Sequence, residues 1–176
     1  MLTSFQLRAS RSVLGLGVRE VGDAIDVSRT TISVWERQPA LQRITSKKKD
    51  TTPLELFFKK YDIIFPDAFT ISLVTDLPKN LNHLTRFQLR AARSTLGLTL
   101  KELSSLTNIP MQIIAYLESK TNYTYINSTP KEFDESFLRN FFEQQYIRFL
   151  DDFTISLIRN PNNQNNLDIL RQVRLY

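Results

Sequence analysis

The stretch Phe5–Leu16 reads FQLRASRSVLGL, and it recurs at Phe87–Leu98 as FQLRAARSTLGL. Further along, FPDAFTISL at Phe65–Leu73 is matched by FLDDFTISL at Phe149–Leu157. Two long matches in the same order are the signature of an internal repeat. The sequence therefore predicts two copies of one domain, at residues 1–76 and 84–160. A Pro- and Asn-containing linker at 77–83 joins them, and 161–176 is predicted to be an Asn-rich linker with a short C-terminal helix.

Each copy is predicted to begin with three helices. A threonine caps the first helix, a glycine ends it, and an Asp or Asn, which tolerates a left-handed backbone, turns the chain from the second helix into the third. The residues at these three positions are Thr3 and Thr85, Gly15 and Gly97, and Asp26 and Asn108. The third helix then begins at Ser28 or Pro110, with Ile32 and Trp35 or Ile114 and Leu117 facing inward.

A fourth helix and a β-hairpin are predicted to complete each copy. Thr52–Glu55 and Thr129–Glu132 both combine a cap, a first-turn proline and a capping-box glutamate, and the helix of the second copy would be about two turns longer. The β-branched and aromatic runs 62–65 with 69–74, and 146–150 with 153–158, predict the hairpins. Because two short strands are not stable alone in water, we expect the hairpins to share one four-stranded sheet. The predicted fold class is mainly α with short β-hairpins.

The segment Leu16–Glu36 resembles the helix-turn-helix of the phage repressor and Cro family of bacterial, xenobiotic-response-element-like regulators. The matching features are the leucine that opens the second helix, the apolar Val21, the small Gly22 and the run VSRTTISVWE at 27–36. Leu98–Glu118 fits the same spacing with a less similar content. The resemblance implies two tandem helix-turn-helix domains. It also implies a partly buried ion pair between the first and third helix of each copy, Arg11 with Glu36 and Arg93 with Glu118.

In that family the third helix enters the major groove of DNA, whose width admits an α-helix. The resemblance implies that base edges in the first copy are contacted by Arg29, Thr30, Ser33 and Val34. It implies that phosphates are contacted by Ser28, Thr31, Arg37, Lys47, Lys48 and Lys49. A solvated helix surface also explains Arg29, and a solvated loop explains the three lysines equally well.

The second copy departs from the family pattern. Its corresponding positions are Met111, Gln112, Ala115 and Tyr116, and the first cation after them is Lys120. Gln112 could read adenine and Tyr116 could reach a phosphate, but this surface is equally suited to contact a protein. Both copies also lack the glutamine that the family usually carries near the start of the second helix, where Val18 and Leu100 stand.

The amino-acid composition indicates which kinds of partner, cell compartment and chemistry suit this chain. The net charge is +5, and residues 1–49 hold nine Lys and Arg against four Asp and Glu, which suits a polyanionic partner. There is no cysteine, and neither an apolar signal segment nor a membrane-spanning run stands out, so we expect a cytoplasmic protein. His83 is the single histidine, and no catalytic constellation, cofactor motif or metal-ligand cluster accompanies it.

The sequence therefore predicts a non-enzymatic, sequence-specific binder of double-stranded DNA that controls transcription, for example as a repressor. Two unequal recognition helices would read an asymmetric site. The alternative is a protein-interaction module, in which one or both copies bind a partner regulator, an RNA polymerase subunit or a toxin. Pairing of two chains into a homodimer stays open.

Overall fold

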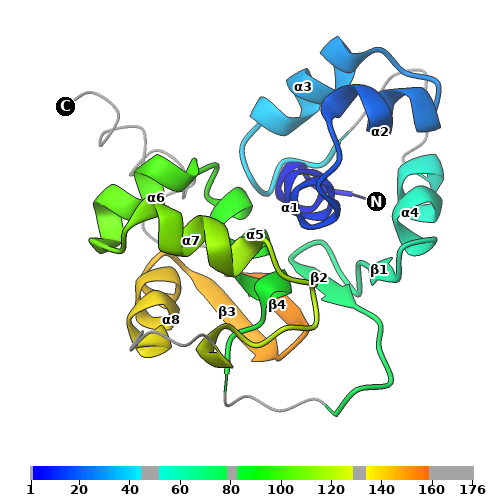
Figure 1. Cartoon of the computed structure of the whole chain (residues 1–176). Helices are drawn as coiled ribbons and strands as arrows, with labels where there is room; N and C mark the ends of the chain where they lie inside the picture. The colour runs from blue at the N-terminus through cyan, green and yellow to red at the C-terminus, as the bar shows by residue number, and fades with distance from the viewer. Residues whose placement is uncertain (1, 45–51, 79–82, 129–133, 159–176) are drawn as a thin grey trace.

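The computed structural model describes residues 2–44, 52–78, 83–128 and 134–158. Within these residues the chain is mixed α/β, with eight α-helices, a short 3-10 helix and one four-stranded antiparallel sheet (Figure 1). We call residues 2–78 the first half and residues 83–158 the second half. The helix predicted within 161–176 lies outside the described residues.

The order of α-helices and strands is the same in both halves, four α-helices followed by two strands, and the second half also contains a 3-10 helix. In the first half these are α1 (Ser4–Leu14), α2 (Val18–Ala24), α3 (Arg29–Arg37), α4 (Thr52–Lys59), β1 (Ile63–Ile64) and β2 (Thr70–Leu73). In the second half they are α5 (Arg86–Thr95), α6 (Leu100–Thr107), α7 (Met111–Glu118), the 3-10 helix η1 (Ile126–Ser128), α8 (Glu135–Gln144), β3 (Ile147–Asp151) and β4 (Thr154–Leu157).

The predicted helix boundaries at α1 and α5 are confirmed. The backbone N–H of Thr3 donates to Gln6 Oε1 at 3.0 Å, and the equivalent bond from Thr85 to Gln88 is 2.9 Å. These bonds tie the first turn of each helix to its capping residue. At the other end Gly15 has φ 71°, a left-handed conformation that glycine adopts without strain.

The turn between α2 and α3 depends on a close backbone approach at Gly22. The N–H of Val27 donates to the Gly22 carbonyl at 2.9 Å. A Cβ atom at residue 22 would lie 2.6 Å from the Val27 carbonyl oxygen, closer than side chains approach. Asp26 has φ 55° in this turn, and Asn108 has the same φ in the turn that precedes α7, as predicted.

The predicted start of the fourth helix in the second half is wrong. α8 begins at Glu135, and the Asp134 side chain caps it by accepting a hydrogen bond from the Ser136 N–H at 2.9 Å. α8 has ten residues and α4 has eight, so the second helix is not two turns longer. Asp134 supplies a cap immediately before the turns that bury Leu138 and Phe142, whereas residues 129–133 lie outside the described residues.

The sheet has the strand order β1-β2-β4-β3, so the two hairpins share one sheet as predicted. The two central strands, β2 and β4, run antiparallel with Ile71 opposite Ile155. Two equivalent hydrogen bonds flank this pair. Leu73 N–H donates to Phe153 O at 2.9 Å, and Leu157 N–H donates to Phe69 O at 2.8 Å. Equivalent residues thus exchange equivalent contacts, which makes the ladder approximately two-fold symmetric.

The first helices of the two halves, α1 and α5, pack against each other and follow the same symmetry (Figure 1). Arg8 Nη2 donates to the Thr95 carbonyl at 3.1 Å, and Arg90 Nη1 donates to the Val13 carbonyl at 3.4 Å. Arg8 and Arg90 occupy equivalent positions of the repeat, as do Val13 and Thr95.

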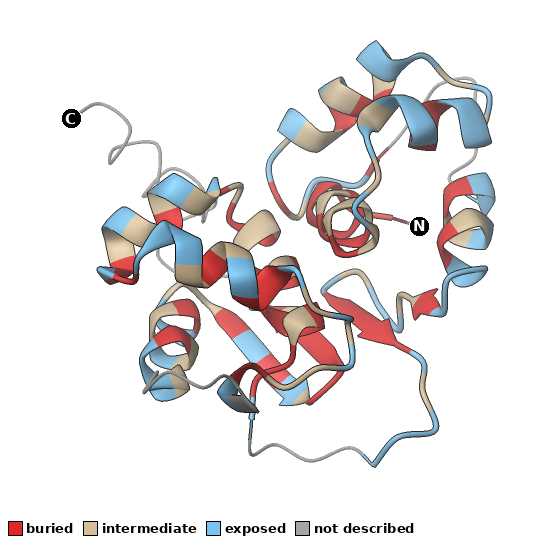
Figure 2. Ribbon diagram, viewed as in Figure 1, coloured by how far each residue is buried: buried red, intermediate tan, exposed pale blue. Residues whose placement is uncertain are grey.

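The buried side chains of both halves form one continuous hydrophobic core. Figure 2 shows buried residues on the inner faces of the helices and through the central strands. The largest fully buried side chains come from both halves, and they include Phe5, Phe58, Phe87, Phe142 and Phe153. Burial of this size is the main favourable contribution to folding.

The two predicted ion pairs are confirmed. Arg11 binds Glu36 through Nε to Oε1 at 2.6 Å and Nη2 to Oε2 at 2.9 Å. Arg93 binds Glu118 in the same bidentate way, at 2.5 and 2.6 Å. The glutamate side chains are only 11% and 7% exposed. Each pair therefore links the first helix of a half to the end of its third helix, largely shielded from water.

We expect Glu36→Ala to lower the free energy of unfolding by about 3 kcal/mol, because it leaves a half-buried guanidinium without its carboxylate. Urea denaturation would measure the change. Asp23→Ala is the matched control, since it breaks the Arg19–Asp23 pair, whose side chains are 82% and 74% exposed, and should change stability little. Similar small effects for both variants would contradict a structural role for the Arg11–Glu36 pair.

The close approach between Gly22 and the Val27 carbonyl oxygen leads to a second prediction. Gly22→Ala should destabilise the protein by about 1–3 kcal/mol, because the added methyl group forces the α2–α3 turn to move. Ser104 on α6 occupies the equivalent position of the second half, so Ser104→Ala is a matched control that should be nearly neutral. Thermal unfolding of both variants tests this, and an unchanged melting temperature for Gly22→Ala would refute it.

Candidate nucleic-acid interface

One face of α3 is buried and the other is presented to solvent. Ile32 and Trp35 lie in the core. The residues predicted to contact DNA lie on the remaining surface, where Ser28, Arg29, Thr30, Val34 and Arg37 are exposed and Thr31 and Ser33 are half-buried. Arg29, Ser33 and Arg37 are spaced four residues apart, so their side chains lie along the same face of the helix.

The start of α3 is organised by Ser28. Its Oγ accepts a hydrogen bond from the Thr31 N–H at 3.1 Å and lies 2.9 Å from Thr31 Oγ1. The two hydroxyls that were predicted to hold phosphate thus bond to each other and cap the helix. The helix start remains a region of positive potential, which favours an anion near Arg29.

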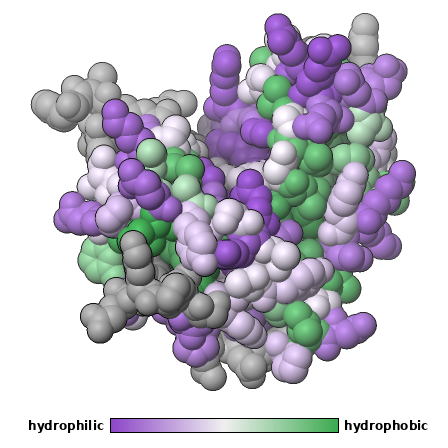
Figure 3. Space-filling view, in the orientation of Figure 1, coloured by the Kyte–Doolittle hydropathy of each residue, from purple (hydrophilic) through white to green (hydrophobic). Residues whose placement is uncertain are grey.

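The end of α3 is fixed to α1 by several hydrogen bonds. Ser4 Oγ donates to the Trp35 carbonyl at 2.7 Å, and Arg8 Nη1 donates to the Glu36 carbonyl at 2.7 Å. With the Arg11–Glu36 pair, these bonds hold α3 rigidly at one end. Figure 3 shows hydrophilic side chains gathered over the part of the molecule formed by α2 and α3, at the top of the view. A fixed helix with a polar outer face is suited to docking against another molecule.

The equivalent helix α7 presents a different surface. Met111 and Tyr116 are 42% and 44% exposed, and Gln112 is also exposed. Lys120 lies just beyond the helix, with Nζ 4.1 Å from the centre of the Tyr116 ring. Lys120 is the one cation among the second-half residues predicted to contact DNA, and this cation–π contact holds it against the Tyr116 ring. α7 itself, with the sequence MQIIAYLE, carries no Lys or Arg.

The predicted residues therefore form two surfaces, one on each half. The surface on α3 contains two arginines, and the surface on α7 is largely apolar and aromatic. Lys47, Lys48 and Lys49 lie outside the described residues.

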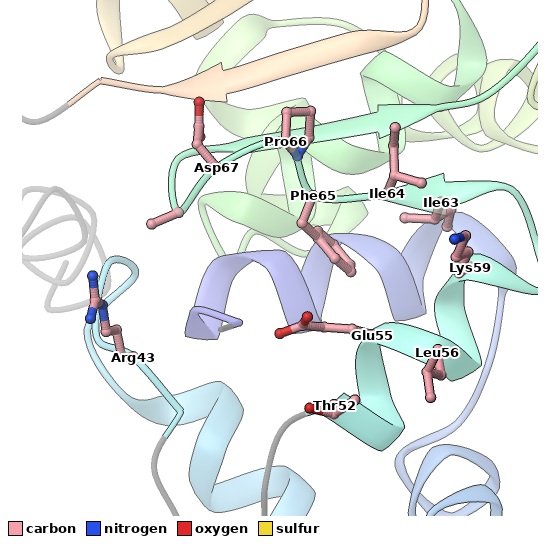
Figure 4. A pocket seen from close by; sticks show the side chains of 11 residues that line it. Arg43, Thr52, Glu55, Leu56, Lys59, Ile63, Ile64, Phe65, Pro66 and Asp67 are labelled. Carbon is pink, nitrogen blue, oxygen red and sulfur yellow. The ribbon is translucent and has the colours of Figure 1, made fainter.

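A cavity of about 540 Å³ lies between α4 and the loop that joins β1 to β2. Figure 4 shows the Phe65 ring directed toward α4, with Glu55 and Lys59 on that helix. The lining of this cavity combines apolar residues with charged residues of both signs, and it includes no histidine.

Across the described residues no group of three or more His, Cys, Asp or Glu could hold a metal ion. His83 instead pairs with Glu135 at 2.5 Å.

None of the helices in the described part of the chain has the length and apolar character needed to cross a membrane. No protein-family model, curated protein or solved structure matches the chain significantly. The surfaces on α3 and α7 are therefore the features of this chain that bear on its function.

Proposed function

We propose that this protein is a sequence-specific binder of double-stranded DNA that regulates transcription. In this proposal residues 1–76 and 84–160 are tandem helix-turn-helix domains of the repressor and Cro type. The observation that carries the proposal is the outer face of α3, where Arg29, Thr30 and Val34 are exposed on a helix that is anchored at its other end.

Such a helix can read DNA by direct contact with base edges. An α-helix of about 10–12 Å diameter fits the major groove. Arg29 would pair with the two acceptors of a guanine, Thr30 and Ser33 would bond to base edges, and Val34 would contact a thymine methyl group. Arg37 would contact a phosphate, which fixes position without reading sequence.

The two halves would contribute unequally to the bound site. The approximate two-fold relation makes α7 the counterpart of α3, but α7 offers Met111, Gln112 and Tyr116 in place of Arg29, Thr30 and Val34. Gln112 is suited to adenine, and the surrounding apolar residues add little electrostatic attraction. The preferred duplex would therefore be asymmetric.

Selection of bound fragments from random duplex DNA, followed by affinity measurement on the selected site, tests the proposal. Arg29→Ala should weaken binding by about 1–3 kcal/mol and relax the preference at one base pair. Gln112→Ala should cost less. Lys60→Ala, which removes an exposed cation beyond α4, is the control and should retain the site preference. Fluorescence anisotropy over a range of salt concentrations would report affinity and the number of phosphate contacts together.

Two results would count against this assignment. If Arg29→Ala left affinity and preference intact while Gln112→Ala or Tyr116→Ala abolished them, α7 would be the reading helix. If no duplex were bound at low salt, the DNA-binding proposal would fail.

A second candidate function follows from the exposed side chains of α7. Met111 and Tyr116 are large, solvent-exposed and adjacent to a stacked lysine, a composition found at protein interfaces. The second half would then bind another protein, such as a partner regulator, an RNA polymerase subunit or a toxin. Tyr116→Ser should weaken that complex, and the complex should persist at salt concentrations that release DNA.

A further inference from the structure

A polar cleft of about 420 Å³ opens where the ends of α1 and α5 meet. Its lining is two-fold symmetric, since every residue from the first half has its repeat counterpart in the second. The charged lining residues are Arg8, Arg11, Arg90 and Arg93, and no acidic residue is among them. Ser12 and Ser94 add two hydroxyl groups to the walls.

Two of these arginines, Arg8 and Arg90, are partly buried and have hydrogen-bond donors that are not fully used. Arg8 Nε and Arg90 Nε are inaccessible to solvent and donate no hydrogen bond to the described residues, although Arg90 Nε lies 3.7 Å from Glu118 Oε2 in an ion pair. Buried donors without partners are rare in folded proteins, and one common reason is a bound ion or water. Both equivalent arginines therefore keep an Nε–H that donates no hydrogen bond within the described residues, although that of Arg90 is attracted to the Glu118 carboxylate.

The other two arginines also have spare capacity. Each guanidinium carries five N–H donors. Arg11 uses three nitrogen atoms to bind Glu36 and the Leu16 carbonyl, and Arg93 uses three for Glu118 and the Leu98 carbonyl. The terminal nitrogens each have a second N–H. The ion pairs therefore fix the orientation of Arg11 and Arg93 without exhausting their donors.

The charges around the cleft do not cancel. Four arginines face two carboxylates, those of Glu36 and Glu118, which leaves about two positive charges near the two-fold axis. Burial lowers the pKa of Arg8 to about 10 and also lowers the pKa of Arg90, because the charged guanidinium loses hydration when it is removed from water. An anion in the cleft would offset this loss of hydration.

We propose that the cleft between α1 and α5 binds one phosphate-type oxyanion per chain, held between the guanidinium groups of Arg8 and Arg90. A phosphate monoester carries about −1.5 to −2 charges at pH 7 and a DNA backbone diester carries one, so the excess positive charge favours either, and the phosphate oxygens can accept from both halves. Planar guanidinium groups match oxyanions through paired hydrogen bonds. The phosphate is either free, as an inorganic ion or small phosphorylated molecule, or part of a DNA backbone.

Occupancy of the cleft would stabilise the contact between the halves. Arg8 already links the Glu36 carbonyl at the end of α3 to the Thr95 carbonyl on α5. A bound oxyanion would add a bridge from Arg8 to Arg90 at the same place. Because a ligand that binds only the folded state stabilises that state, phosphate should raise the melting temperature.

Titration of the full chain with inorganic phosphate, at constant ionic strength set by chloride, tests the proposal. Calorimetry should show saturable binding of one phosphate per chain. Arg90→Gln should weaken it at least tenfold, and Arg90→Lys, which keeps the charge but loses the planar fork, should have an intermediate effect. Arg19→Gln removes an exposed arginine on α2 and should leave phosphate affinity unchanged. In NMR spectra of the unmodified protein, phosphate should shift the amide signals of Leu16 and Leu98 together.

Absence of saturable binding would overturn the proposal, as would equal losses in Arg90→Gln and Arg19→Gln. NMR shifts confined to the start of α3 would also overturn it, even if Arg90→Gln failed to fold.

Competition with the selected duplex separates the two sources of phosphate. Displacement of DNA by phosphate would indicate that the cleft holds a backbone phosphate, whereas simultaneous binding would indicate a free one. The proposal does not rest on DNA binding, because the phosphate titration stands without it.

Discussion

The antiparallel pairing of β2 with β4 is the contact on which the rest of the structure depends. β1 has two residues, β2 four, β3 five and β4 four, so neither two-stranded hairpin has the size to be stable in water alone. Placing Ile71 opposite Ile155 joins both hairpins into one sheet and sets the relation between the halves. Once this register is fixed, α1 must meet α5, since Gln6 and Gln88 tie these helices to the backbone at Thr70 and Asp151.

Much of this fold could be predicted from the sequence because the patterns that indicate it are local or occur in both copies of the repeat. The caps at Thr3 and Thr85 and the left-handed turns at Asp26 and Asn108 each depend on short spacings that occur twice. The ion pairs of Arg11 and Arg93 join residues 25 positions apart, and it was the family resemblance that implied them. The joined sheet was predictable from an energetic argument, since two short strands need partners. The start of α8 was not, because Thr129–Glu132 and Asp134 both offer caps and the buried face of the helix decides between them.

The candidate site was predictable only in part. Periodicity separates the exposed Arg29 from the buried Trp35, because both lie on one helix. It does not reveal the cleft at Arg8 and Arg90. That cleft exists because two helices far apart in the sequence meet at their ends, and the meeting depends on the sheet register and the shape of the whole core. The repeat of Leu-Arg-Ala around both arginines was the available signal, but it also fits an ordinary solvent-facing position on an amphipathic helix.

The joining of both halves in a single polypeptide distinguishes this sheet from the interface of a homodimer. In a homodimer each substitution is present in both subunits, and dilution shifts the equilibrium toward dissociated subunits. Here the contact between β2 and β4 is intramolecular, so its strength does not depend on protein concentration. Equivalent positions are also free to differ, as Gly22 and Ser104 or Arg43 and Tyr125 do. A chain of this kind can change one half to suit one partner while the other half keeps its original surface.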